Sequence, residues 1–186
     1  FGLVAVLDDQ PQGVFYASQF YRDDAGNILG QAVTPTGLPA TNADGTPVFV
    51  PATRDDDGVL RDDAGNVVFP VRLGTPGIIG DPNPDFSLSL INEIEVSQRV
   101  SLRVQFDGSF GGDVFNFTRR LASLGAFGTL AEYQREIEGE LPFGYNGNTA
   151  IPNTDGLRRG SFSLFEYWIE DGTFVKLREV SLSYIV

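Results

Sequence analysis

The sequence predicts an all-β protein built from antiparallel strands, with long loops and one short helix. Two neighbouring segments of about 10–11 residues alternate apolar and polar side chains with a period of two, as strands do. The chain contains 22 Gly and 11 Pro among its 186 residues, and this composition favours turns over helices. No apolar run approaches the roughly 20 residues that a membrane helix needs, so any membrane contact must be made by strands.

The charge and the missing residue types exclude several classes of function. The formal net charge is −12, from 25 acidic and 13 basic residues, and such a chain repels nucleic acid. The sequence has no Cys, which excludes disulfides and thiolate metal sites, and no His, which removes the commonest general base. Catalytic sets of the Ser-His-Asp or Cys-His kind are therefore excluded, and there is no Walker-type phosphate loop.

The first part of the chain is expected to be a short strand followed by a long polar region. Residues 1–7 form an apolar run, and residues 8–85 are rich in Asp, Gly, Pro, Thr and Asn. Within this region the sequence RDDAGN occurs twice, at 22–27 and at 61–66, each time followed by two apolar residues. We expect each copy to form a β-turn between short strands, with Gly-Asn at the tight positions.

The strongest pattern lies at residues 86–110. Apolar and polar side chains alternate from Phe86 to Val96 and again from Val100 to Phe106, with a short turn at residues 97–99 between them. This pattern predicts a hairpin whose strands have the length of membrane-spanning β-strands. Its apolar side could pack on the core of a soluble protein or face lipid, and alternation alone does not distinguish the two.

Residues 111–172 are expected to form a second loop region that contains a helix near 129–138. Thr129 is its expected N-cap, Glu132 completes a capping box, and Gly139 ends it.

The last strand is expected at residues 173–186, after a turn at residues 170–172. Its apolar residues move from odd positions (Val175, Leu177) to even positions (Val180, Leu182), which predicts a β-bulge near residues 178–179.

Four segments of the chain resemble, in the same order, segments of the SusC/RagA family of TonB-linked outer-membrane transporters. They are residues 9–16 (DQPQGVFY), 79–86 (IGDPNPDF), 106–116 (FDGSFGGDVFN) and 168–184 (WIEDGTFVKLREVSLSY). The chain departs from the family pattern at Ala17 (usually Gly), Asp81 (usually Asn), Phe115 (usually Tyr) and Lys176 (usually Arg). The four segments together span nearly the whole chain.

The resemblance implies that residues 1–186 are part of a large transmembrane β-barrel in a Gram-negative outer membrane. Residues 86–110 would be a membrane hairpin and 173–186 a membrane strand, with 8–85 and 111–172 as extracellular loop regions. The apolar side of the hairpin would face lipid, and Glu93, Glu95, Arg103 and Asp107 would face the lumen. The plug domain, the TonB-binding segment and the final strands of the family would lie outside this chain.

The resemblance also implies a function and partners. The whole protein would import oligosaccharides or peptides with energy from TonB, beneath a SusD-like surface lipoprotein, and would perform no covalent chemistry. A secreted, soluble all-β module for glycan binding or adhesion is the alternative, and a surface glycosidase domain is a third possibility. The glycosidase would need a carboxylate pair, for which Glu93 with Glu95, or Glu166 with Glu170, are the candidates.

Few residues stand out as binding sites. Asp55 and Asp57 lie in an acidic run next to Gly58 that could hold Ca²⁺ through carboxylate oxygens, although a solvated acidic turn explains the same pattern. Tyr16, Tyr145 and Trp168 lie in or beside the expected loops, where their rings could stack on sugars or simply pack.

Overall fold

The computed structural model describes residues 3–122, 131–142, 144–145 and 163–185. Its paired strands are antiparallel and its helices short, which confirms the all-β antiparallel class. The strands are β1 (Val4–Ala5), β2 (Val14–Phe20), β3 (Leu29–Gln31), β4 (Phe49–Arg54), β5 (Leu60–Asp62), β6 (Phe69–Pro70), β7 (Arg72–Gly80), β8 (Phe86–Ser97), β9 (Val100–Phe110), β10 (Asp113–Phe115), β11 (Ile169–Asp171) and β12 (Phe174–Tyr184). The helices are α1 (Phe117–Ala122), α2 (Ala131–Ile137) and the 3₁₀ helix η3 (Phe165–Trp168).

The chain divides into two compact units. Unit 1 is built mainly from Tyr16–Ile79 and Phe115–Ile169, and unit 2 from Val4–Phe15, Gly80–Val114 and Glu170–Val186. Each unit is described by itself.

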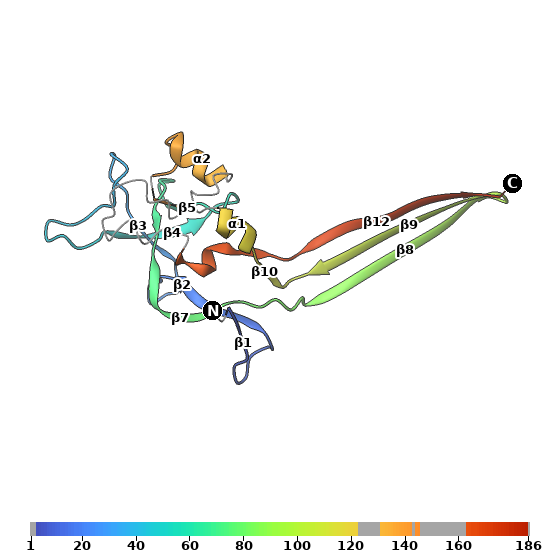
Figure 1. Ribbon diagram of the computed structural model, residues 1–186, viewed down its shortest axis with the longest axis horizontal. Coiled ribbons are helices and arrows are strands. Elements are labelled where there is room, and N and C mark those ends of the chain that lie inside the picture. The colour runs from blue at the N-terminus through green and yellow to red at the C-terminus, as the bar shows by residue number, and fades with distance from the viewer. Residues whose placement is uncertain (1–2, 123–130, 143, 146–162, 186) are drawn as a thin grey trace. The chain divides into compact units, whose positions relative to one another are not determined.

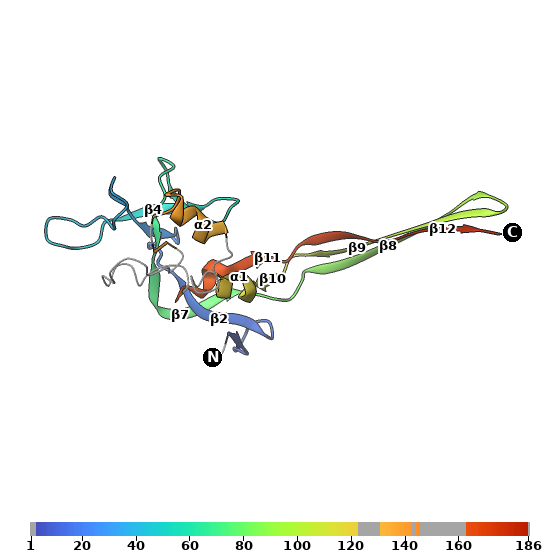
Figure 2. The same cartoon turned by 45° about the horizontal axis from the view of Figure 1, so that its top comes forward.

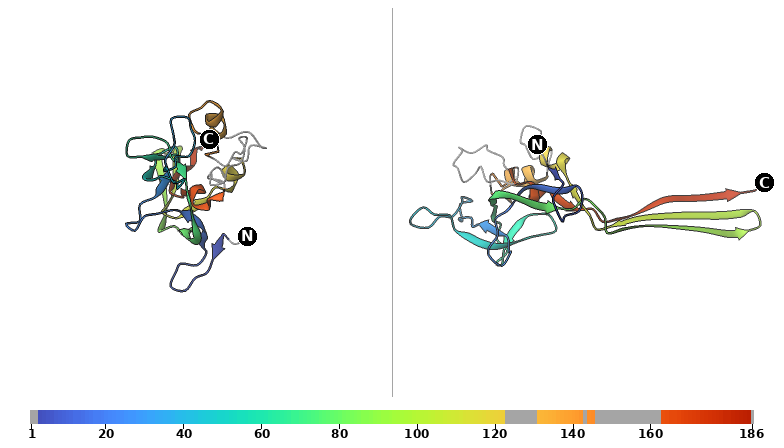
Figure 3. Two further views of the ribbon diagram at one scale, coloured as in Figure 1. Left: turned by 90° about the vertical axis from the view of Figure 1, so that its left-hand side faces the viewer. Right: turned by 90° about the horizontal axis from the view of Figure 1, so that it is seen from below.

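The main feature of unit 2 is a three-stranded sheet in the order β12-β9-β8. Figures 1 and 2 show the three long strands running side by side, and the right-hand view of Figure 3 shows them from below. A turn at Gln98 and Arg99 joins β8 to β9, and Phe86 pairs with Phe110 at the other end of the hairpin. The hairpin predicted at residues 86–110 is therefore confirmed.

The predicted bulge in the last strand is also confirmed. The register between β12 and β9 shifts between Leu177 and Glu179, so that Arg178 is the extra residue. Leu177 pairs with Phe106 before the bulge, and Val180 pairs with Val104 after it. Because the inserted residue offsets the change from odd to even positions, the apolar side chains on both sides of the bulge share one face of the sheet.

Unit 1 contains a four-stranded sheet in the order β5-β4-β3-β6 and its own hydrophobic core. The buried residues of this core are Phe20, Ala52, Val59, Leu60, Val68, Phe69, Leu141, Tyr145, Leu164, Tyr167 and Trp168. Several of its aromatic members contact one another edge to face, with the ring centroids of Tyr167 and Trp168 4.9 Å apart and those of Tyr145 and Tyr167 6.1 Å apart. Residues 8–85 thus contribute to a folded hydrophobic core, although their composition is mostly polar.

The polar region is organised by one turn that recurs five times within the described residues. Each loop is closed by two backbone hydrogen bonds, from the first amide to the fifth carbonyl and from the fourth amide to the first carbonyl. The fourth residue is always Gly with φ between 81° and 87°, as in a type I turn followed by a glycine bulge. The loops are residues 23–27, 34–38, 42–46, 55–59 and 62–66.

This recurrence confirms the two turns predicted from the RDDAGN repeat and adds three more. The expectation that Gly-Asn takes the tight positions is wrong, because Asp-Ala occupies the centre of each of these two turns and Gly follows it with a positive φ. The first residue is Asp, Asn or Thr, and its side chain closes the loop in several copies. The Oδ1 atoms of Asp23 and Asp62, for example, accept the amides of Asn27 and Asn66, each at 2.8 Å. The signal in the sequence was therefore Asp, Asn or Thr three residues before Gly, of which the hexapeptide repeat was one case.

The helices differ from the expectation of a single loop helix. α1 was not foreseen. It begins after Asn116, whose Oδ1 accepts the amide of Arg119 at 2.9 Å and so acts as its N-cap. α2 confirms the predicted helix and ends where Gly139 takes a φ of 82°. The expected cap at Thr129 lies outside the described residues.

The turn predicted at residues 170–172 is wrong. Glu170 and Asp171 belong to β11, which pairs with β10. Gly172 does not adopt a positive φ, so it is not needed there for a tight turn. Its amide instead donates to the carbonyl of Gly112 at 2.8 Å, and a Cβ at position 172 would meet the same oxygen at 2.8 Å. The reason for glycine is therefore a close approach of two backbones.

Candidate functional site

The sheet of unit 2 has one apolar face and one polar face, set by its register. The apolar face is formed by Phe86, Leu88, Leu90, Asn92 and Ile94 of β8, by Val100, Leu102, Val104, Phe106, Gly108 and Phe110 of β9, and by Val175, Leu177, Val180, Leu182 and Tyr184 of β12. Asn92 is its one polar member. These side chains do not pack on a core, since Leu88 is 56% exposed and Leu182 is 71% exposed. Except at the bulge of β12, each strand presents every second residue to this face, as the alternation predicted.

Aromatic residues stand at both ends of the apolar face. Phe86 and Phe110 stack at one end with ring centroids 4.7 Å apart, and Tyr184 pairs with Val100 at the other end. The strand from Val100 to Phe110 is roughly 34 Å long at about 3.4 Å per residue. At a tilt of about 40° it would cover roughly 26 Å, close to the apolar band of about 25 Å on a transmembrane β-barrel.

The polar face is held together by a network centred on Asp107. Its Oδ1 accepts hydrogen bonds from Ser89 at 2.8 Å and from Gln105 at 3.1 Å, and its Oδ2 accepts one from Nε of Arg178 at 2.8 Å. Arg103 pairs with Glu179 at 3.4 Å on the same face. Ser89, Asp107 and Arg178 come from three different strands, so the network links the whole sheet.

The segments that carry the family resemblance meet at one junction in unit 2. Asn83 donates through Nδ2 to the carbonyl of Gln12 at 3.0 Å, which joins the first segment to the second. The amide of Asp85 donates to the carbonyl of Phe110 at 2.9 Å, which joins the second to the third. The bond from Gly172 to Gly112 joins the fourth segment to the third.

Two of the aromatic candidates lie in the core of unit 1. Tyr145 and Trp168 are 0% exposed, so neither ring presents a face to a ligand at the surface. The hydroxyl of Tyr145 accepts the amide of Leu60 at 2.5 Å, and burial raises the pKa of this phenol well above its usual value. This placement favours packing for both residues. Tyr16 lies half-buried in β2.

Both oxygens of the Asp55 carboxylate accept hydrogen bonds from neighbouring residues. Its Oδ1 accepts the amide of Val59 and its Oδ2 accepts Nε of Arg61, both at 2.8 Å. Burial would raise the pKa of Asp55, but these two hydrogen bonds outweigh burial and hold it below its usual value. No group of three or more acidic side chains suited to a metal occurs in the part of the chain that the structure describes.

The candidate carboxylate pairs also have other roles. Oε2 of Glu166 accepts the amide of Phe20, and Oε1 accepts Nη2 of Arg22, both at 2.6 Å. Glu93 lies opposite Arg103 and Glu95 opposite Ser101, on the polar face of the sheet. Glu166 therefore anchors the end of β2, and Glu93 and Glu95 line the polar face of the sheet in unit 2.

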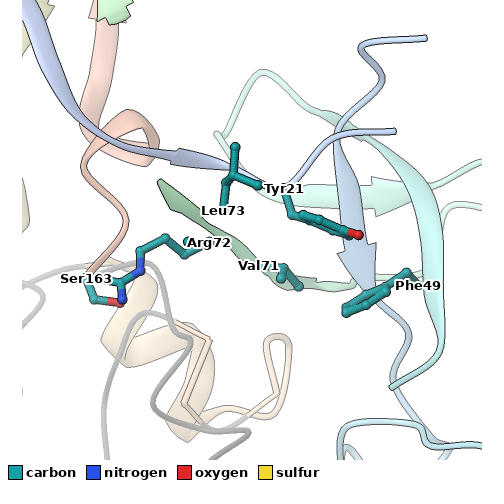
Figure 4. Close-up of a pocket in the computed structure, with 7 residues that line it drawn as sticks. Tyr21, Phe49, Val71, Arg72, Leu73 and Ser163 are labelled. Carbon is teal, nitrogen blue, oxygen red and sulfur yellow. The ribbon is translucent and has the colours of Figure 1, made fainter. Parts of the chain in front are cut away.

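Sequence reasoning missed a pocket of about 420 Å³ in unit 1. It is lined by Tyr21, Phe49, Val71, Arg72, Leu73, Gly74 and Ser163. Figure 4 shows the side chain of Arg72 on one side, toward Ser163, and the rings of Tyr21 and Phe49 on the other. Residues 71–74 are consecutive, but Tyr21, Phe49 and Ser163 come from distant parts of the sequence, and no local motif links them to residues 71–74.

The comparisons with known proteins bear on the family. A TonB-dependent receptor from Formosa agariphila, named P3, is 29% identical to the chain over 107 residues. The chain is similar to a TonB-dependent receptor. The match covers 58% of the chain but 10% of the relative, so the chain spans about a tenth of that protein's length. No protein-family model and no solved structure matches the chain.

This similarity supports the TonB-dependent receptor part of the family resemblance. The narrower SusC/RagA assignment rests on the four segments. None of the helices in the described residues has the length and apolar character needed to cross a membrane.

Proposed function

We propose that the chain forms part of the transmembrane barrel and extracellular loops of a TonB-dependent transporter in a Gram-negative outer membrane. The single observation that carries this proposal is the exposed apolar face of the β12-β9-β8 sheet, backed by a polar face. The transporter would be of the SusC/RagA type. It would import oligosaccharides or peptides, with TonB and a SusD-like lipoprotein as partners and without covalent chemistry.

The apolar face suits lipid better than water. Soluble proteins seldom expose contiguous apolar patches larger than a few hundred Å². A transmembrane barrel requires the arrangement found here, with apolar side chains outside, polar side chains facing the lumen and aromatic residues at both interfaces. Asp107 and its partners would then line the lumen.

The connections between the strands favour one orientation. The turn at Gln98 and Arg99 is short, whereas the chain before Phe86 and the chain between β9 and β12 leave from the opposite end of the sheet. Barrels of this kind have short turns on the periplasmic side and long loops outside. Unit 1 would therefore belong to the extracellular loops.

The outer edges of the sheet need further strands. In the described residues β8 and β12 each pair with β9 alone, so one edge of each has unpaired backbone groups. Unpaired amides and carbonyls cost several kcal/mol each in lipid. We expect additional strands of the same barrel to cover both edges.

A matched pair of substitutions on β9 tests the lipid contact. Val104→Arg puts a charge in the middle of the apolar face. Gln105→Arg puts the same charge on the polar face one residue away, where the guanidinium can still donate to Asp107 as Gln105 does. Folding into lipid vesicles, measured by urea titration, should lose about 2–4 kcal/mol for Val104→Arg and change little for Gln105→Arg. An equal loss of folding free energy for the two substitutions would contradict the proposal. So would a protein that is stable and monomeric without detergent or lipid.

The transport activity needs its own test. Cells that express the protein should accumulate labelled oligosaccharides or peptides, and deletion of TonB should abolish this uptake. Retention of a SusD-like lipoprotein during purification would support that partner. Uptake that persists without TonB would contradict the proposed energy source.

A further inference from the structure

The pocket of unit 1 contains a cation without a protein partner. Within the described residues, Arg72 and Arg99 are the arginines whose side chains make no hydrogen bond, ion pair or ring contact. Arg99 lies at the tip of the β8–β9 hairpin, whereas Arg72 lines the pocket. The chain has 25 acidic and 13 basic residues, so carboxylates that could pair with Arg72 are abundant, yet its guanidinium in the pocket has none as a partner among the described residues. Its planar fork suits carboxylate and sulfate groups.

The opposite side of the pocket is aromatic. The rings of Tyr21 and Phe49 lie 5.2 Å apart at 53°, and Phe49 is 37% exposed (Figure 4). The backbone of Tyr21 is fixed on both sides, because its amide donates to Val71 at 2.8 Å and its carbonyl accepts the amide of Leu29 at 2.7 Å. The backbone at Tyr21 is therefore fixed, and its ring packs against that of Phe49 before a ligand arrives, which lowers the entropy cost of binding.

We propose that this pocket binds a sugar ring that carries an anionic substituent, either a carboxylate or a sulfate. Arg72 would hold the anion, and Tyr21 and Phe49 would contact the CH-rich face of the ring. The volume lies within the usual range of about 300–1,000 Å³ for small-ligand pockets. The inference rests on the proposed function, because a pocket in an extracellular loop would meet an oligosaccharide before import.

Gly74 offers a way to block the pocket without disturbing its walls. A Cβ at this position would have no atom within 4 Å, and the residue does not take a positive φ. Gly74→Phe should therefore place a ring in open space beside the pocket.

Binding is tested by calorimetry on the full-length protein in detergent. The probes are tetragalacturonate, a sulfated galactan tetrasaccharide, the methyl ester of tetragalacturonate as a matched neutral sugar, and tetraglutamate as an acidic peptide. We expect at least one anionic sugar to bind at least about tenfold more tightly than the methyl ester, since bonds to charged groups are the stronger ones. The sugar that binds identifies the anion as carboxylate or sulfate.

The variants give the residue-level test. Arg72→Ala should weaken binding of the anionic sugar at least about tenfold, and Arg72→Lys should give an intermediate loss, because it keeps the charge but not the fork. Gly74→Phe should abolish binding, whereas Arg99→Ala, which removes the other unpaired arginine, should leave it unchanged.

Three results would overturn the inference. They are binding of both anionic sugars no tighter than that of the methyl ester, an Arg72→Ala variant that binds like the wild type, and tighter binding of tetraglutamate than of both anionic sugars. Failure here is distinct from failure of the transporter proposal. A protein that inserts into vesicles and tolerates Gln105→Arg but not Val104→Arg, yet binds no anionic sugar, loses this inference alone.

Discussion

Asp113 and Asp81 hold each other through two hydrogen bonds. Oδ2 of Asp113 accepts the amide of Asp81 at 2.8 Å, and the amide of Asp113 donates to the carbonyl of Asp81 at 2.6 Å. A Cβ on Gly80 would meet Oδ2 of Asp113 at 2.8 Å, so glycine is needed beside this pair. The two bonds fasten the segment before β8 to the segment after β9, at the open end of the hairpin.

Removal of the Asp113 carboxylate should destabilise this junction. Asp113→Ala leaves the amide of Asp81 without its acceptor, and we expect a loss of about 1–3 kcal/mol in the free energy of unfolding. Asp113→Asn keeps an acceptor oxygen and should lose less. Urea unfolding in detergent micelles measures both. If Asp113→Ala unfolds at the same urea concentration as the wild type, the stability of the junction does not depend on this pair.

Gly172 should tolerate no larger residue. Gly172→Ala brings a methyl group against the carbonyl of Gly112, which must move and weaken its bond to the amide of residue 172. We expect a loss of about 1–3 kcal/mol, as for other cases of overpacking. Gly74→Ala is the matched control, because its Cβ meets nothing within 4 Å and its φ is not positive. Equal stability of the two variants would contradict the close approach.

The sheet of unit 2 could be predicted from sequence because its information is local. Alternation gave the strands, and the change from odd to even positions gave the bulge at residue 178. Each signal depends on neighbours within a few residues.

The core and the pocket of unit 1 could not be predicted in this way. Tyr145 and Leu60 are 85 residues apart, and Tyr21, Phe49 and Arg72 line one pocket although they come from separate segments of the chain. The aromatic residues of a polar region looked like candidates for ligand stacking, yet Tyr145 and Trp168 form its core. Local periodicity does not indicate which residues far apart in the sequence will contact one another.

The hydroxyl of Tyr145 should matter to the stability of unit 1. Tyr145→Phe leaves the buried amide of Leu60 without its acceptor, and we expect a loss of about 1–3 kcal/mol. The raised pKa of Tyr145 means that folding favours the neutral form of this phenol. Its contribution to the free energy of unfolding is therefore fully present below about pH 10 and falls as pH rises further. The free energy of unfolding between pH 9 and pH 11 tests this, with Tyr145→Phe expected to show the weaker alkaline decline. A decline as steep as that of the wild type would contradict the role of this phenol.

Asp55 should stabilise its hairpin loop as an anion that pairs with Arg61. Because the pKa of Asp55 is lowered in the folded protein, its contribution is present above its ordinary pKa of about 4 and is lost as pH falls further. Asp55→Asn should therefore be less stable than the wild type at pH 7. Its free energy of unfolding should also fall less than that of the wild type between pH 5 and pH 2. Asp57→Asn is the control, since the side chain of Asp57 accepts no hydrogen bond from a described residue, and it should behave like the wild type.

The same variants separate this role of Asp55 from calcium binding. If Asp55 and Asp57 together held Ca²⁺, added calcium would raise the unfolding midpoint of the wild type, and either substitution would remove that rise. With both oxygens of Asp55 engaged by Val59 and Arg61, we expect calcium to leave all three midpoints unchanged. A calcium-dependent rise that both substitutions abolish would mean that the ion displaces Arg61, and Asp55 would then be a metal ligand instead of an anchor for the loop.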